Sequence, residues 1–393
     1  MASDPVVILA ARRTPIGAML GVFASVPGHA LGAASIRGAL QSAGADPGIA
    51  GEVIMGCVLP AGQGQAPARQ AALAAGVPQS VPATTVNKMC GSGMRAVMYG
   101  ADQIMAGSAE FVIAGGLESM TNAPYLLPKA RAGYRLGHGE IIDHMFYDGL
   151  QSPWDGKLMG CFADATAAKY GFSRADQDAF AAESVRRAVA AVESGAFEAE
   201  IAPVTISDRK GERVISRDET PFTVSLEKIP NLKPAFGKDG TVTAASSSSI
   251  ADGASALLLA SASAAARAGL KPIATIVAHA SHAHAPEWFT TAPGGAIKTV
   301  LKRAGWQAAD VDLYEINEAF AVVTMAAMKD IGIAHDRVNV HGGACALGHP
   351  IGATGARIMT TLIHALKRHG KKRGLAALCI GGGEATAIAI ELS

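Results

Sequence analysis

The group in this sequence best placed for chemistry is a cysteine at the start of a predicted helix. Cys90 follows a short β-branched run at 84–86, is followed by Gly91 and Gly93, and precedes an apolar pattern of helical period over 94–105. This order predicts a strand, a tight turn and a helix. Unpaired N–H groups and the helix dipole favour an anion at that position, so we expect a thiol more acidic than usual. The alternative is an inert buried thiol, although small flanking residues would serve no purpose around one.

Three further polar side chains fall at the ends of predicted strands or in the turns that follow them. They are Asn317, His349 and Cys379. Ligands of open parallel sheets bind at the carboxyl edge of the strands, so these groups are expected to share a cleft. The Asn317 amide could hold a water or polarise a carbonyl. His349 is fixed between a glycine and a proline, which suits a base for a thiol, whereas a structural role is the more frequent one for a lone histidine.

Cys379 ends an apolar strand and is followed by three glycines at 381–383. Backbone N–H groups in such a turn are free to stabilise a negatively charged oxygen. A core thiol is the alternative for Cys379 itself. No close cysteine and histidine spacing occurs, so we expect no metal site.

Composition restricts the class of protein. A chain of 393 residues suggests two domains or one duplicated unit, and a formal net charge of +1 gives no reason to expect a nucleic-acid partner. An odd number of cysteines without a CxxC pair favours reduced thiols. We found no signal peptide, membrane-length apolar run or peroxisomal ending, so we expect a cytoplasmic protein without membrane partners. The cysteines are Cys57, Cys90, Cys161, Cys345 and Cys379.

Strands alternate with helices in both ends of the chain, which predicts an α/β fold with a mainly parallel sheet. Residues 272–393 repeat the order of elements found in the first 119, including a glycine-rich turn and helix at 348–366 that parallels the one at 91–105. This shared order indicates duplication. The predicted strands of the first half are 6–10, 53–58, 84–86 and 111–116, and its predicted helices are 31–43, 67–75 and 94–105.

Residues 120–245 differ in composition from the rest of the chain and are richer in proline, charged and aromatic side chains. One helix is clear within them, with Ser173 as its N-cap and Asp176 at the third position. We interpret this segment as an insertion that covers a site. Its basic residues could equally form a solvated face.

Four blocks of the sequence together resemble the thiolase family, and the resemblance covers the whole chain. The blocks are Asn87–Gly93, Asn317–Ala321, Gly342–Gly352 and Cys379–Gly383. The resemblance implies a duplicated five-layered α-β-α-β-α sandwich with an inserted loop domain. It implies an N-terminal half at 1–119 completed by 246–270, an insertion at 120–245, and a C-terminal half at 271–393.

The resemblance also implies a Claisen condensation of coenzyme A thioesters, with acetyl-CoA, acetoacetyl-CoA and CoA as substrates and products and no separate cofactor. Cys90 would accept the acyl group. His349 would deprotonate Cys90 and, with a water on Asn317, would hold a thioester oxygen. Cys379 would take the α-proton of the second acetyl-CoA. Backbone N–H groups of Cys90 and Gly381 would form the other oxyanion hole.

By the same resemblance, the insertion carries coenzyme A and a tetramerisation loop at about 125–145, so we expect a homotetramer built as a dimer of dimers. The residues expected to line the pantetheine and acyl channel are Leu150, Met159, Phe236, Ala244, Ser248 and Phe320.

Some positions depart from the family pattern. Leu158 stands where short-chain members often carry histidine, Phe289 begins a segment that usually reads Met-Gly-Thr-Gly-Pro, and no adenine-side arginine is evident near 221–222. We expect an acetyl-CoA acetyltransferase that prefers acetoacetyl-CoA. The alternatives are a degradative 3-ketoacyl-CoA thiolase of broader chain length, a ketoacyl synthase, which would lack Cys379, and an idle CoA- or lipid-binding module.

Overall fold

The computed structural model describes residues 4–208 and 211–393. The strands in these residues are β1 Val6–Arg13, β2 Gly17–Ala18, β3 Glu52–Gly56, β4 Ala83–Val86, β5 Phe111–Ser119, β6 Tyr125–Leu126, β7 Ile142–Asp143, β8 Val204–Asp208, β9 Gly211–Ile215, β10 Ala251–Ser261, β11 Ala274–Ala283, β12 Leu313–Ile316, β13 Arg373–Ile380 and β14 Glu384–Leu392. The α-helices are α1 Gly28–Ala43, α2 Pro67–Ala74, α3 Ser92–Met105, α4 Met159–Tyr170, α5 Arg174–Glu193, α6 Ala262–Arg267, α7 Ala292–Ala304, α8 Ala321–Ile331, α9 Ala344–Leu347 and α10 Thr354–Arg368. Short 3₁₀ or π turns are η1 Pro47–Ile49, η2 Met145–Leu150, η3 Thr220–Phe222, η4 Leu226–Asn231, η5 Pro286–Thr291, η6 Ala308–Asp310 and η7 His335–Arg337.

The predicted duplication is confirmed by how the main sheet is paired. Its centre is the antiparallel pair β1 and β11, where Val7 lies opposite Thr275. Outward from β1 the order is β10, β5, β3 and β4, and outward from β11 it is β14, β13 and β12, ending in a parallel bridge between Tyr314 and Val338. Corresponding neighbours in the two halves also run in the same relative direction.

The prediction of a mainly parallel sheet was wrong, because the sheet is mixed. Only β3 with β4, β3 with β5, and β12 with β13 are parallel pairs of described strands. The cause is how the chain returns to the sheet. A short glycine turn joins β13 to β14, and such a turn can only connect antiparallel strands. The long excursion at 120–250 likewise brings β10 back antiparallel to β5.

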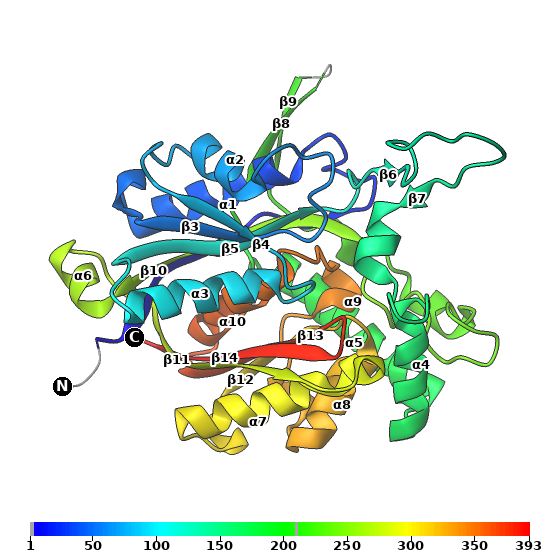
Figure 1. Cartoon of the computed structure of the whole chain (residues 1–393). Coiled ribbons are helices and arrows are strands. Elements are labelled where there is room, and N and C mark those ends of the chain that lie inside the picture. Colours follow the sequence, from blue (N-terminus) through cyan, green and yellow to red (C-terminus); the bar gives the residue numbers. More distant parts are fainter. Residues whose placement is uncertain (1–3, 209–210) are drawn as a thin grey trace.

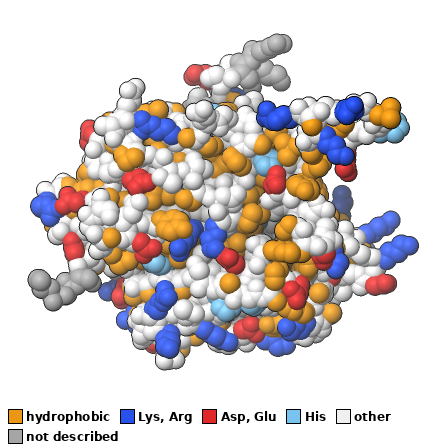
Figure 2. Space-filling model, in the orientation of Figure 1, with side chains coloured by type: hydrophobic (Ala, Val, Ile, Leu, Met, Phe, Trp, Pro, Cys, Tyr) orange, Lys and Arg blue, Asp and Glu red, His pale blue; other side chains and the backbone are white. Residues whose placement is uncertain are grey.

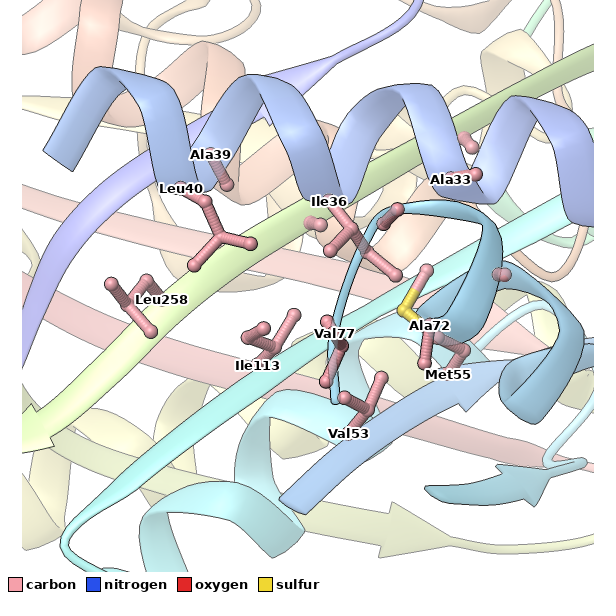
Figure 3. Packing of buried hydrophobic residues seen from close by; sticks show 14 of the residues in the cluster. Ala33, Ile36, Ala39, Leu40, Val53, Met55, Ala72, Val77, Ile113 and Leu258 are labelled. Atoms are coloured by element: carbon pink, nitrogen blue, oxygen red, sulfur yellow. The ribbon is translucent and has the colours of Figure 1, made fainter. Parts of the chain in front are cut away.

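The elements form the five layers that the resemblance implied, as Figure 1 shows. Helices α1 and α2 cover the outer face of the first half-sheet, α3 and α10 lie between the two half-sheets, and α7 and α8 cover the outer face of the second. Figure 3 shows the first outer layer, where Ile36 and Leu40 of α1 pack onto Ile113 of β5 and Leu258 of β10. All four side chains are buried, and each such burial stabilises the fold by roughly 1.5–3 kcal/mol.

Two glycines let the central helices α3 and α10 approach backbone to backbone. A Cβ on Gly355 would lie 2.4 Å from the backbone nitrogen of Met94, and a Cβ on Gly93 would lie 2.9 Å from that of Ala356. Neither position therefore accepts a larger residue without a shift of the backbone. The contact holds the N-termini of the two helices together, and each helix begins just after a candidate reactive residue.

The segment between β5 and β10 leaves the layers and covers one end of the molecule. Its predicted helix is α5, and the Ser173 cap with its Asp176 capping box is confirmed. The stretch between β6 and β7 extends away from the body as an arm, on which Figure 2 shows basic and hydrophobic side chains. Exposed apolar residues of the arm and its flanks include Tyr125, Leu127, Leu136 and Ile141.

Candidate active site

The Cys90 turn is built as the sequence predicted, with the cysteine between β4 and α3. Met89 has a left-handed backbone at φ +47°, which is uncommon for a residue with a side chain and occurs where a turn is tightly constrained. The hydroxyl of Ser92 supplies the constraint. It accepts from the Lys88 N–H at 2.8 Å and donates to the Met89 carbonyl at 2.7 Å. The turn leaves Cys90 partly exposed.

The second half places its polar groups at strand ends, also as predicted. Asn317 directly follows β12, and Cys379 is the last residue but one of β13. The turn from β13 to β14 requires glycine, because Gly382 and Gly383 have φ values of +96° and +87°. The N–H of Gly381 is directed at the sulfur of Cys90.

The imidazole of His349 has a defined tautomer. Its Nδ1 lies 2.6 Å from the hydroxyl of Thr354, and that hydroxyl is 2.9 Å from the carbonyl of Pro350. A carbonyl only accepts, so the hydroxyl donates its proton there and accepts from Nδ1–H. The other nitrogen, Nε2, therefore carries the lone pair, and it is buried without a hydrogen-bond partner among the described residues. Burial and the charge of Arg357 lower the pKa of His349 to about 3, so the ring is neutral and can act as a base.

One cavity of about 220 Å³ brings most of the predicted residues together. Cys90, His349 and Gly381 line it. The predicted channel residues that also line it are Leu150, Met159, Phe236, Ser248 and Phe320. Ala244 is exposed and does not line it.

Asn317 and Cys379 do not line this cavity. Asn317 is 1% exposed, and neither atom of its amide has a hydrogen-bond partner within residues 4–208 and 211–393. Cys379 is fully buried in a cluster with Phe162, Phe289 and Phe320. Burial and the charge of Cys90 raise the pKa of Cys379 well above its ordinary value, so the two thiols are close enough to influence each other.

The expectation of an unusually acidic Cys90 was wrong for the free protein. Burial raises the pKa of Cys90 to about 11, although the Gly381 N–H and its own N–H act in the opposite direction. The helix N-terminus is present as predicted, but desolvation by the surrounding apolar residues outweighs it. The thiol is thus protonated near neutral pH, and it needs a base when it attacks.

Several lining residues were not predicted as such. Ala319 and Ile351 lie inside the blocks identified from the sequence and could have been inferred from them. Leu158 and Phe289 had been noted only as departures from the family pattern. The remaining ones come from segments without any local signal, and they are Met120, Phe146, Gly149, Gly160, Ser247, Ser249 and Ile250.

No group of three or more histidine, cysteine, aspartate or glutamate side chains in the described part of the chain could hold a metal ion. No described helix combines the length and the hydropathy needed to cross a bilayer.

Comparison with known proteins agrees with this geometry. The family model described as "Thiolase, N-terminal domain" matches residues 6–263, and "Thiolase, C-terminal domain" matches residues 270–392. An acetyl-CoA acetyltransferase of Pseudomonas aeruginosa is 48% identical, with 98% of each chain covered. One of Schizosaccharomyces pombe is 47% identical over the full length of both chains. The crystal structure of the Bacillus anthracis acetyl-CoA acetyltransferase superposes with a TM-score of 0.97 at 42% identity, covering 100% of both chains. With a cysteine, a neutral histidine and a glycine N–H around one cavity, and both family domains in tandem, the chain belongs to the thiolase family.

Proposed function

We propose that this protein is an acetyl-CoA C-acetyltransferase, which condenses two acetyl-CoA molecules reversibly to acetoacetyl-CoA and CoA. The observation that carries the proposal is one apolar-walled cavity lined by a thiol, Cys90, a neutral imidazole, His349, and the N–H of Gly381. The names of the full-length relatives support the same activity.

In the first half-reaction, Cys90 takes the acetyl group. Its thiol proton passes to Nε2 of His349 as the sulfur attacks the carbonyl carbon of acetyl-CoA. The N–H groups of Cys90 and Gly381 stabilise the resulting oxyanion, and one such donor is typically worth about 3–4 kcal/mol. The carbon–sulfur bond to coenzyme A then breaks, and the leaving thiolate recovers the proton from His349. The products are acetyl-Cys90 and CoA.

In the second half-reaction, Cys379 acts as the base. Its thiolate removes an α-proton from the second acetyl-CoA, and the carbanion attacks the carbonyl carbon of acetyl-Cys90. A water held by the unpaired Asn317 amide stabilises the enolate oxygen of that acetyl-CoA, and Nε2 of His349 can donate to the same oxygen only while it carries a proton. The bond from the acetyl group to Cys90 breaks, which releases acetoacetyl-CoA, and the Cys90 thiolate then takes the proton from Cys379, so that both sulfurs return to their starting states. The electrostatic interaction between Cys379 and Cys90 supports this role, because it requires the two sulfurs to lie close together.

The cavity walls support a pantetheine and short-acyl channel formed by Leu150, Met159, Phe236, Ser248 and Phe320. Ala244, which is exposed, remains a proposed contact without support from the cavity lining. We infer a division into an N-terminal half at 1–119 completed by 246–270, a covering insertion at 120–245 and a C-terminal half at 271–393. The paired order of strands supports this division. Five free cysteines support the proposed reducing, cytoplasmic compartment.

The test of the proposed function is peptide-resolved mass spectrometry after mixing with acetyl-CoA, combined with an assay for acetoacetyl-CoA. We expect an acetyl adduct on the Cys90 peptide and formation of acetoacetyl-CoA. Cys90→Ala should abolish both. An adduct on another cysteine alone, or an adduct without any condensation, would contradict the proposal, and the second result would favour an idle CoA-binding module.

A further inference from the structure

A buried carboxylate on β5 joins the two halves of the molecule beneath the active site. Glu118 is 0% exposed. Its oxygens accept the N–H groups of Val58 at 2.9 Å, Leu59 at 3.1 Å and Gly352 at 2.9 Å. The first two belong to the segment after β3 in the first half. Gly352 belongs to the loop of the second half that also carries His349.

The fit between Glu118 and this loop is close. A Cβ on Gly352 would lie 2.5 Å from the Glu118 carboxylate, so the loop can approach it only with glycine there. Ile351, next to the anchored N–H of Gly352, lines the active-site cavity. Leu59 and Ile351 pack into one buried cluster, against which the partly exposed Cys90 also packs. Glu118 therefore binds the loop that carries the base and the segment whose Leu59 side chain packs in the same cluster as the nucleophile.

The charge of Glu118 is unfavourable for the nucleophile itself. It raises the pKa of Cys90, which opposes formation of the thiolate. Glu118 is also isolated, since no lysine or arginine among the described residues forms an ion pair with it. Burial raises the pKa of Glu118 to about 7, while its three N–H donors act in the opposite direction. Because the charge of Glu118 opposes ionisation of Cys90, we look for its role elsewhere. Its hydrogen bonds to the backbone of both halves offer that role.

We propose that Glu118 is a positioning residue for the acyl-transfer step, whose carboxylate ties the His349 loop to the first half and so fixes Nε2 of His349 against Cys90. This inference rests on the proposed function and adds a residue to it. Misplacement of a reacting group by about 1 Å can reduce a rate by about 100-fold. A tether that acts through geometry alone should therefore change kcat far more than KM.

Two substitutions distinguish the effect of the charge of Glu118 from the effect of its side-chain length. Glu118→Gln keeps the shape, removes the charge and turns one acceptor into a donor facing N–H groups. Glu118→Asp keeps the charge and shortens the side chain by one methylene. The matched control is Glu200→Gln, because Glu200 is also a fully buried carboxylate, paired with Arg13, but its charge does not act on Cys90 or His349.

The measurements are kcat and KM for thiolysis of acetoacetyl-CoA, and the pH dependence of Cys90 alkylation by iodoacetamide followed on the Cys90 peptide. For Glu118→Gln we expect kcat to fall by about tenfold or more with KM within about threefold, while the alkylation midpoint moves to lower pH. For Glu118→Asp we expect a fall in kcat with the midpoint near that of the unmodified protein. Glu200→Gln should leave both readouts unchanged, even if its melting temperature falls.

Three results would overturn the inference. They are an unchanged kcat in both Glu118 variants, a rise in KM that accounts for the whole loss, and an equal loss in Glu200→Gln. If a Glu118→Gln variant does not fold, the Glu118→Asp variant carries the same comparison. Absence of thiolysis in the unmodified protein would instead overturn the proposed function, and the alkylation profiles would still report whether Glu118 controls the reactivity of Cys90.

Discussion

His349 and Thr354 are joined by a hydrogen bond of 2.6 Å between Nδ1 and the threonine hydroxyl, and this contact sets which ring nitrogen can act as the base. The hydroxyl lies on the first turn of α10 and is itself tied to the carbonyl of Pro350. The loop, the helix N-terminus and the tautomer of the ring are therefore fixed by one side chain.

Replacing Thr354 with valine should lower kcat by about tenfold, because the buried Nδ1–H of His349 loses its acceptor at a cost of about 1–3 kcal/mol. The ring would then also populate the tautomer with the proton on Nε2. Thr354→Ser keeps the hydroxyl and should retain most of the activity. The kcat of each variant is measured by steady-state thiolysis of acetoacetyl-CoA. Equal activity of the valine and serine variants would show that the hydroxyl does not set the tautomer.

Cys379 should act on carbon acids and not on the acyl group. We expect Cys379→Ala to form acetyl-Cys90 at a near-normal rate but to lose condensation and α-proton exchange, because Cys379 is the proton acceptor that the apolar cluster of Phe162, Phe289 and Phe320 encloses. Deuterium exchange of the acetyl group, followed by mass spectrometry, measures the second property. Normal exchange in this variant would require a different base.

Acid pH should destabilise the protein through its buried neutral histidines. The pKa of His349 is lowered by burial to about 3, so between pH 6.5 and 3 the unfolded chain binds a proton that the native protein does not. The contribution of His349 to the free energy of unfolding is therefore fully present above about pH 6.5 and is lost as the pH falls toward 3. His341, whose pKa burial lowers to about 4, acts in the same direction.

Urea unfolding at pH 7, 6 and 5 tests this expectation. His349→Asn should show a smaller loss of unfolding free energy over this range than the unmodified protein, while the exposed His138→Asn should not differ from it. Parallel curves for all three proteins would show that His349 does not titrate on unfolding.

The sequence predicted the reactive groups because each lies beside a local signal. Cys90 has its glycines and its helix, His349 has a rigid proline, and Cys379 precedes a glycine turn. The acidity of Cys90 could not be predicted in the same way, since the apolar groups that desolvate it come from both halves and from the insertion. Glu118 was missed for a related reason. It lies within a continuous buried strand, and its partners are about 60 and 234 positions away.

The prediction of strand direction was partly wrong for a topological reason. The helical pattern between strands predicts parallel neighbours, and this holds for β3 with β4 and β5. It fails for β10, because the direction in which a chain re-enters a sheet after 130 residues is not encoded near the strand itself.

The oligomer is expected to be a tetramer joined through the arm between β6 and β7. Leu136 is 98% exposed on this arm, and Tyr125, Leu127 and Ile141 add further exposed apolar area. Light scattering at micromolar concentration should give the mass of four chains. The Leu136→Glu substitution should shift the measured mass toward that of two chains. Val214→Glu, on the exposed strand β9, is the control and should leave the mass unchanged. A stable monomer in the unmodified protein would contradict the assembly.

The preference for a short acyl chain should follow from the apolar side chains that limit the cavity. The cavity of about 220 Å³ is lined by Leu158, Met159 and Phe289. The ring of Phe289 packs edge-to-face against Phe162, with the ring centroids 6.2 Å apart. This contact leaves Phe289 little freedom to swing away from a longer chain. We therefore expect kcat/KM for thiolysis to be highest for acetoacetyl-CoA, with a modest tail toward C5 and C6.

Phe289→Ala is the variant that tests this closure. It removes a ring from the wall, so kcat/KM for the C6 substrate should rise relative to C4 by about 10- to 200-fold, the range that a methylene-sized change in an apolar pocket supports. Val214→Ala, exposed and remote from the cavity, serves as the control. Values that rise steadily from C4 to C10 in the unmodified protein would place it in the degradative branch, because such a profile requires an acyl channel that Phe289 and Leu158 leave open.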